Sequence, residues 1–205
     1  MSFTLRVRWT LIADRFPEPW RACARCGAQR PFRCSGKFRL NANGSRLDAW
    51  LVYKCSACDD TWNHTLFERR NAHDIDVDLL SALESNDPKL ARRCAFDVIA
   101  LRRNTSRVEE FANVAVRKER LDGSGHAPTR LEIVLAAPDP VSLRLDRLLA
   151  TELGLSRSRM AALADRARIR TTGKLNRAVR DGLLVEIELD GDSAAEAILR
   201  NALPE

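Results

Sequence analysis

Alternating apolar and polar residues dominate the first half of the chain and predict β-strands. From residue 32 to residue 40, apolar or small side chains alternate with Arg33, Ser35, Lys37 and Arg39. A period of two places the two sets on opposite faces of a strand, one of which is basic. Asn43-Gly44 then favours a tight turn, and residues 47–53 predict the returning strand of a hairpin. A third strand is predicted for residues 61–67.

Residues 3–12 alternate in the same way and predict a half-buried strand, which we expect to extend this sheet. Helical spacing follows over residues 75–83. Asp87 and Pro88 suit the cap and the first position of a second helix, whose apolar residues continue to Leu101. These two segments predict a helical hairpin packed against the sheet.

The second half of the chain mixes strands and helices. Short strands are predicted around residues 114–116 and 131–135, in a region that we interpret as a β linker. A helix then ends at Gly154 and another begins after Ser156. A short strand, a basic loop and a last strand over residues 183–189 complete a compact module.

Two Cys-x-x-Cys pairs flank the predicted hairpin, Cys23 with Cys26 and Cys55 with Cys58. A hairpin brings the two pairs together, and four thiolates at tetrahedral angles are the ligands that structural Zn²⁺ prefers. This spacing predicts a zinc ribbon. Disulfide bonds and a redox-active dithiol are the alternative interpretations. The first is disfavoured because no secretory signal pattern is present, and the second because two pairs lie on turns.

Four other residues are weaker candidates for ligands. Cys34 and Cys94 fall on the apolar faces of a predicted strand and helix, where cysteine packs as a small hydrophobic residue. His64 and His73 are alternative metal ligands, but four cysteines already complete a tetrahedral site.

The sequence therefore predicts an α+β fold in four segments. They are a zinc-ribbon-like β domain at residues 1–73, a helical hairpin at 74–104, a β linker at 105–140 and an α+β module at 141–205.

The net charge of +6 over 205 residues indicates a polyanionic partner. The positive charge is concentrated in two blocks. Residues 1–73 hold 13 Lys and Arg against 6 Asp and Glu, and residues 141–180 hold ten against three. No apolar run is long enough to cross a bilayer, so we expect a cytoplasmic protein without a membrane partner.

Short motifs in the second basic block run from Ser156-Arg157-Ser158 to Gly173, and then over Val179-Arg180-Asp181-Gly182 and Val185-Glu186-Ile187. This segment resembles the alpha-L RNA-binding motif of the small-subunit ribosomal protein S-four family, although Ala167 stands where that family usually has glycine. The resemblance implies an RNA-binding module in which Arg157, Lys174 and Arg180 face RNA. A helix amino terminus with adjacent arginines also suits phosphate.

A second set of motifs lies in the amino-terminal half: Cys23-Ala24-Arg25-Cys26-Gly27, Cys34-Ser35-Gly36-Lys37-Phe38-Arg39, Asn41-Ala42-Asn43-Gly44, Trp50-Leu51-Val52-Tyr53-Lys54-Cys55 and Thr61-Trp62-Asn63. Through these motifs the chain resembles an uncharacterised bacterial family, the domain of unknown function 1062. That resemblance implies a bacterial protein and no particular activity.

We therefore expect a non-enzymatic RNA-binding protein that holds Zn²⁺ and contacts structured RNA, such as ribosomal or transfer RNA. The residues expected to contact phosphates are Arg33, Lys37, Arg39, Arg144, Arg147, Arg157, Arg159, Lys174, Arg177 and Arg180. The alternative is an adaptor that docks onto a larger bacterial complex through exposed apolar residues such as Trp50 or Trp62. We expect no enzyme and no small-molecule substrate, because the sequence offers no nucleophile with a paired base and a zinc ion bound by four thiolates has no position for water.

Overall fold

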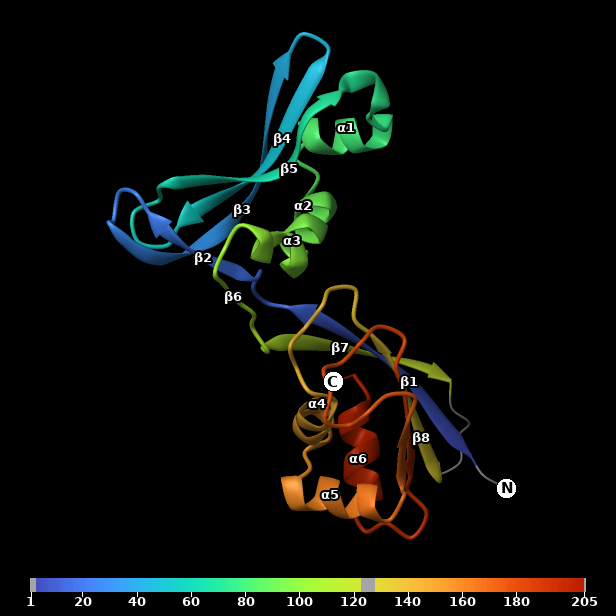
Figure 1. Ribbon diagram of the computed structural model, residues 1–205. Coiled ribbons are helices and arrows are strands. Elements are labelled where there is room, and N and C mark those ends of the chain that lie inside the picture. Colours follow the sequence, from blue (N-terminus) through green and yellow to red (C-terminus); the bar gives the residue numbers. More distant parts are fainter. Residues whose placement is uncertain (1–2, 123–127, 205) are drawn as a thin grey trace. The chain divides into compact units, whose positions relative to one another are not determined.

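The computed structural model describes residues 3–122 and 128–204, which form ten strands in two five-stranded sheets together with six α-helices (Figure 1). The predicted α+β class is confirmed. The chain divides into two compact units, which differ from the four segments expected. The ribbon unit comprises Arg15–Glu110, and the mixed-sheet unit comprises Met1–Asp14 with Phe111–Glu205. His126, for which the sequence indicates no partner, lies outside the described residues.

The sheet of the ribbon unit contains only antiparallel pairs, in the order β5-β4-β3-β2-β6. The predicted hairpin consists of β3 (Ala28–Asn43) and β4 (Arg46–Cys55), and the predicted third strand is β5 (Thr61–Asn71). Because Asn43 pairs with Arg46, the turn itself is Gly44-Ser45, with only Gly44 at a positive φ of 60°. The remaining strands are β2 (Glu18–Cys23) and β6 (Arg107–Glu109).

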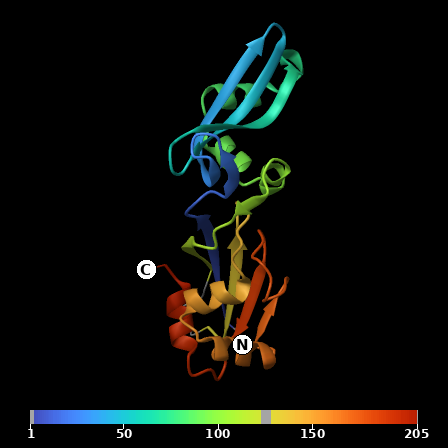
Figure 2. The ribbon, with the colours of Figure 1, turned by 60° about the vertical axis from the view of Figure 1, so that its left-hand side comes forward.

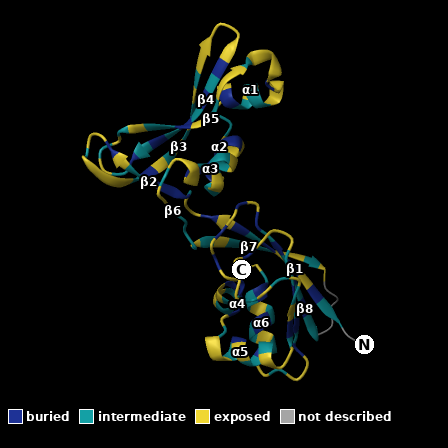
Figure 3. Ribbon diagram, viewed as in Figure 1, coloured by how far each residue is buried: buried dark blue, intermediate teal, exposed yellow. Residues whose placement is uncertain are grey.

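Burial alternates along β4, as its sequence pattern requires (Figure 3). Ala49, Leu51 and Tyr53 are fully buried, whereas the residues between them are half-exposed. The buried side of the strand packs on the helices of this unit, with Leu51 and Tyr53 against Ala91 and Ala95. The ribbon unit therefore has one sheet face in its core and one face turned away from its helices (Figure 2).

Three short α-helices follow the sheet: α1 (Val77–Glu84), α2 (Pro88–Ala95) and α3 (Val98–Arg103), with a 3-10 turn, η1 (Ala72–Asp74), before them. Asp87 caps α2 by accepting a hydrogen bond from the Leu90 N–H, as predicted. The prediction of one continuous helix from Pro88 to Leu101 is wrong. Asp97 caps a new helix by accepting from the Ala100 N–H, and this interrupts the apolar stripe.

The sheet of the mixed-sheet unit has the strand order β7-β1-β8-β10-β9. Its first strand in the sequence, β1 (Thr4–Ala13), lies between β7 (Val114–Asp122) and β8 (Arg130–Ala136), antiparallel to the former and parallel to the latter. The sheet is completed by β9 (Ile169–Thr171) and β10 (Leu184–Glu188).

This pairing overturns two predictions. The strand at residues 3–12 does not extend the ribbon, and residues 105–140 are not a linker, because β7 and β8 flank β1 in the second sheet. Val7, Trp9 and Leu11 have no exposed surface and form the core with side chains of β8 and β10. Alternation predicts a half-buried strand but does not identify its partner strands.

Three helices belong to the mixed-sheet unit: α4 (Leu145–Leu153), α5 (Arg157–Asp165) and α6 (Ala195–Ala202). Helix α4 ends at Gly154, and Ser156 caps α5. Both boundaries confirm the sequence prediction. Helix α6 was not predicted. It packs with Ile198 fully buried, and the Trp9 indole N–H donates to the Ala202 carbonyl at 3.0 Å.

Helix α5 ends in a left-handed residue that is not glycine. Ala167 has a φ of 54°, its N–H donates to the Ala164 carbonyl, and the Arg168 N–H donates to the Leu163 carbonyl. These two bonds form a Schellman motif, in which the left-handed position normally holds glycine because a Cβ is strained there.

Replacing Ala167 with glycine should stabilise the protein. Relief of strain is worth about 1–2 kcal/mol and the added flexibility of the unfolded chain costs about 0.4–1 kcal/mol, so a net gain of about 0.5–1 kcal/mol is expected. Urea unfolding followed by circular dichroism measures this gain. The matched control Ala161→Gly, on an exposed position within α5, should instead lose about 1 kcal/mol. Equal losses in both variants would contradict the argument.

Candidate functional site

The two Cys-x-x-Cys pairs lie on turns of the same geometry. Each pair begins at the last residue of a strand, Cys23 in β2 and Cys55 in β4. The Gly27 N–H donates to the Cys23 carbonyl at 2.9 Å, and the Asp59 N–H donates to the Cys55 carbonyl at 3.0 Å. Gly27 and Asp59 have φ values of 64° and 58°. Each turn therefore presents both of its sulfur atoms to the same side.

The four sulfur atoms meet in one cluster. Cys23 Sγ lies 3.5 Å from Cys58 Sγ, Cys26 Sγ lies 3.9 Å from Cys55 Sγ, and all four atoms lie within 4.8 Å of one another. Four thiolates at about 2.3 Å from a tetrahedral ion stand about 3.8 Å apart. The cluster therefore fits a metal ion with four thiolate ligands, as the sequence predicts.

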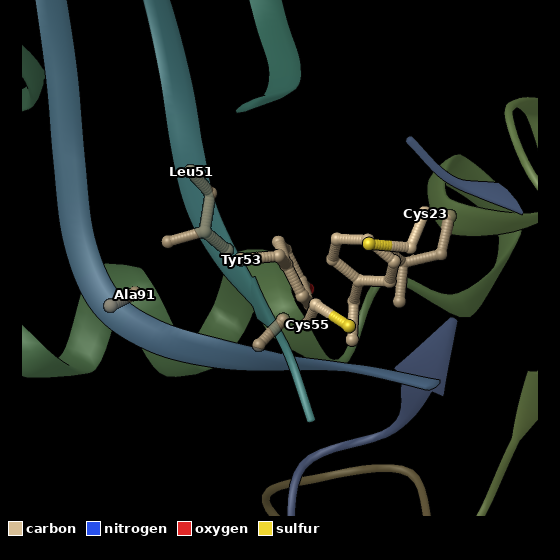
Figure 4. Packing of buried hydrophobic residues seen from close by; sticks show 8 residues of the cluster. Cys23, Leu51, Tyr53, Cys55 and Ala91 are labelled. Carbon is tan, nitrogen blue, oxygen red and sulfur yellow. The ribbon is translucent and has the colours of Figure 1, made fainter. Parts of the chain in front are cut away.

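The cluster adjoins the core of the ribbon unit. Cys23 and Cys55 are buried together with Leu51, Tyr53 and Ala91 (Figure 4). The Cys55 sulfur is desolvated, but hydrogen bonds from the backbone N–H groups of Ala57 and Cys58 outweigh this and lower the pKa of the thiol to about 7. The pKa values of the Cys23, Cys26 and Cys58 thiols are raised instead, so Cys55 is the thiol of the cluster that ionises most readily.

The remaining cysteines do not join the cluster. All six cysteines are free thiols, so no disulfide is formed. Cys34 and Cys94 are half-buried against the core, as predicted for small hydrophobic residues. Burial raises the pKa of the Cys34 thiol to about 11 and also raises the pKa of Cys94.

Neither histidine of the ribbon unit belongs to the cluster found among the described residues. His64 is buried and packs against the rings of Tyr53 and Trp62 at centroid distances of 6.1 and 5.2 Å. Burial lowers the pKa of its imidazole, which favours the neutral ring. His73 is exposed in η1.

The basic residues predicted on the ribbon strand are exposed and point away from the helices. Arg33 and Arg39 of β3 pair with Lys54 and Trp50 of β4, so these four side chains share one sheet face. Lys37 is exposed at a β-bulge between Cys34 and Phe38. Lys54 is a cation that we did not predict, although the alternation of residues 50, 52 and 54 opposite the buried residues of β4 is a signal for it.

A hollow of about 690 Å³ in the mixed-sheet unit brings together three of the predicted arginines. Arg144 and Arg147 line it from the start of α4, and Arg157 lines it from the start of α5. The acidic residue of this lining is Asp146, which accepts hydrogen bonds from the Arg144 guanidinium, including one from Nε at 3.1 Å. Across the described residues, neither Arg147 nor Arg157 forms an ion pair. The hollow is thus positively charged.

The basic loop between β9 and β10 lies beside the start of α4. The Leu145 N–H donates to the Arg177 carbonyl at 2.9 Å, and the Asp146 N–H donates to the Leu175 carbonyl at 2.8 Å. Helix α4 has no side-chain cap, so these loop carbonyls satisfy its first N–H groups. The same contacts position the exposed residues Lys174, Arg177 and Arg180.

Arg159 differs from the other predicted contact residues. Its guanidinium forms an ion pair with Asp192, a carboxylate with a side chain 1% exposed. Asp192 also lies 3.4 Å from Arg168, and its pKa is lowered because hydrogen bonds from the Ala194 N–H and Arg159, together with the charges of both arginines, outweigh desolvation. Arg159 is therefore engaged within the fold.

Comparison with known families gives one match: the family described as "Protein of unknown function (DUF1062)" matches residues 40–175. The match covers about two thirds of the chain. The chain belongs to this family. The DUF1062 match includes Cys55, Cys58, α4 and α5, whereas Cys23 and Cys26 precede it. No curated protein and no solved structure matches the chain. Among the described residues, no helix is long and apolar enough to cross a membrane.

Replacing Cys55 with serine should abolish metal binding and destabilise the ribbon unit. The purified protein is expected to carry one metal ion per chain by mass spectrometry, because four thiolates in this arrangement bind a divalent ion tightly. Cys55→Ser should lose the ion and melt at a lower temperature, and a chelator should have the same effect on the wild-type protein.

Cys94→Ala is the matched control, because Cys94 is half-buried outside the cluster. This variant should keep its metal ion. A wild-type protein without metal, or a Cys55→Ser variant as stable as Cys94→Ala, would refute the metal centre.

Proposed function

We propose that this DUF1062 protein is a non-enzymatic, zinc-containing RNA-binding protein that contacts structured RNA, such as ribosomal or transfer RNA, through a basic surface on each unit. The observation that carries the proposal is the hollow between α4 and α5, where Arg144, Arg147 and Arg157 converge. These residues come from two helices and lie beside a basic loop that is more distant in the sequence.

Phosphate is the ligand that best matches this arrangement. Planar guanidinium groups bind phosphate oxygens through paired hydrogen bonds, and clustered cations gain affinity by releasing counterions from the nucleic acid. Arg147 and Arg157 are exposed, and Lys174, Arg177 and Arg180 extend the charge along the loop. Contacts of this kind carry no base information, so the shape of the folded RNA would provide the selectivity.

The order of elements supports RNA as the partner. Residues 145–188 form helix, helix, strand, loop and strand, which is the order predicted for the segment that resembles the alpha-L motif. Arg157, Lys174 and Arg180, the residues that the resemblance assigns to RNA contact, are all exposed.

Zinc is the metal that best matches the cysteine cluster. Soft thiolate ligands in a tetrahedral arrangement favour Zn²⁺, and a zinc ion with four protein ligands stabilises a fold without offering a position for water. Such an ion would close the end of the ribbon sheet. This role supports the expectation of a binding protein over an enzyme.

A protein-interaction adaptor is the alternative function. Large apolar side chains that are exposed to solvent favour this alternative. The described residues include two of them, Val77 in α1 and Ile99 in α3, which are 75% and 72% exposed. Trp50 and Trp62, which we expected to be exposed in an adaptor, are only half-exposed.

Charge reversal in the hollow tests RNA binding. Arg147→Glu combined with Arg157→Glu should weaken binding to a folded RNA such as transfer RNA by at least about tenfold, because two phosphate contacts are lost. Fluorescence anisotropy between 50 and 200 mM salt measures the affinity, and the salt dependence should become shallower by roughly 0.7–0.9 per lost contact.

The control variant Lys89→Glu with Arg93→Glu has the same change in charge on exposed positions of α2, outside the predicted contact residues. It should bind nearly as tightly as the wild-type protein. Equal weakening in both double variants would mean that only net charge matters, and no salt-dependent binding by the wild-type protein would favour the adaptor.

A further inference from the structure

The ribbon sheet has a face that its own helices leave uncovered. This open face consists of Arg33 and Arg39 of β3, Trp50, Val52 and Lys54 of β4, and Thr61, Asn63 and Thr65 of β5. The strand register places these residues on the same face, because Trp50 pairs with Arg39 and Thr65. In the same way, Lys54 pairs with Arg33 and Thr61. The opposite face packs on α1 and α2 through residues such as Ala49 and Leu51 (Figures 1 and 2).

Trp50 differs from the other three tryptophans, all of which have roles within the fold. Trp9 is fully buried, and Trp62 packs against Tyr53 and Phe32. The Trp20 indole N–H donates to Glu109 at 3.0 Å. Trp50 is half-exposed, and in the part of the chain that the structure describes its ring contacts one charged group, the Arg39 guanidinium at 5.9 Å.

The surroundings of Trp50 are positively charged. Arg33, Arg39 and Lys54 lie on the open face, and Lys37 projects from the bulge beside it. Three carboxylates lie on or beside this face. Glu18 is paired with Arg15 at 2.7 Å and lies 3.6 Å from Arg33. Asp48 accepts hydrogen bonds from the Arg69 N–H and from Asn41. Glu68 accepts a hydrogen bond from the Thr65 hydroxyl at 3.4 Å. Because all three carboxylates are engaged and four cations outnumber them, the face attracts a polyanion.

A half-exposed aromatic ring among cations favours unpaired nucleotides over a duplex. Every base offers a flat surface that stacks on an aromatic side chain, and guanidinium groups stack on bases as well. In a duplex the bases already stack on one another, so only their phosphates are available. From Trp50 to Lys54 the face extends about 13 Å along β4, with neighbouring strands about 4.8 Å apart.

We propose that the open face of the ribbon sheet binds an unpaired segment of RNA, with a base stacked on Trp50 beside Arg39 and its neighbouring phosphates on Arg33, Lys37 and Lys54. This inference rests on the proposed RNA-binding function and specifies its substrate: RNA in which an unpaired loop or end adjoins the folded part. The ribbon unit would read unpaired bases, and the hollow of the mixed-sheet unit would bind phosphates.

Two RNA hairpins that differ only in their loops test this inference with the full-length protein. One has a loop of unpaired uridines, and the other has abasic riboses at the same positions, so that the phosphates are identical and the bases are absent. The wild-type protein should bind the uridine loop roughly 5- to 150-fold more tightly, as expected for stacking of one base. Anisotropy gives the affinity of each hairpin.

Variants at position 50 separate stacking from general hydrophobic contact. Trp50→Leu should bind both hairpins equally, because leucine is apolar and has no ring. Trp50→Phe should restore most of the preference. Val77→Ala, which shortens an exposed apolar side chain on α1, should leave the preference unchanged. Circular dichroism and metal content verify that each variant is folded.

The outcomes distinguish this inference from the proposed function. Equal binding of both hairpins by the wild-type protein, or a preference that survives in Trp50→Leu, would overturn the stacking role while leaving RNA binding intact. If the wild-type protein binds neither hairpin at low salt, both the function and the inference are wrong.

Discussion

The meeting of four sulfur atoms at the end of the ribbon sheet is the constraint on which this unit depends. Cys23 and Cys55 terminate β2 and β4, so the cluster fixes the ends of two strands that are not adjacent in the sheet. Burial of the same two residues joins the cluster to the core. A sheet with one buried face has little apolar surface to stabilise it, and a metal ion bound by the four sulfur atoms would compensate by cross-linking the strand ends. The helices of the unit leave the other face uncovered (Figure 2).

In the mixed-sheet unit, hydrogen bonds to the first N–H groups of α4 determine where the basic loop lies. Helix α4 lacks a capping side chain, and carbonyls of the loop between β9 and β10 accept its first N–H groups. The basic residues of that loop, Lys174, Arg177 and Arg180, are consequently held near the helix that contributes Arg144 and Arg147. The contacts that satisfy the helix backbone thus also hold the cations of the loop beside the helix.

A count of the basic residues in the sequence overestimates how many cations are free to contact a ligand. Arg159 and Arg168 neutralise the buried Asp192, and Arg144 is paired with Asp146. Arg147 and Arg157 have no such partners in the described part of the chain, which makes them better positions for a test than the charge density alone. The same reasoning distinguishes Trp50 from Trp62, whose ring packs between Phe32 and Tyr53.

Local patterns in the sequence determine much of this protein. The spacing of the cysteines predicts the cluster, alternation predicts β3, β4 and β5, and capping residues such as Asp87 and Ser156 predict where helices begin, because each signal acts within a few residues. Only the tertiary structure decides that β1 pairs with β7 and β8, that α6 covers Trp9, and that the α4–α5 hollow lies beside the basic loop. Those choices depend on contacts between distant segments, and the alternation within a strand is compatible with many partners.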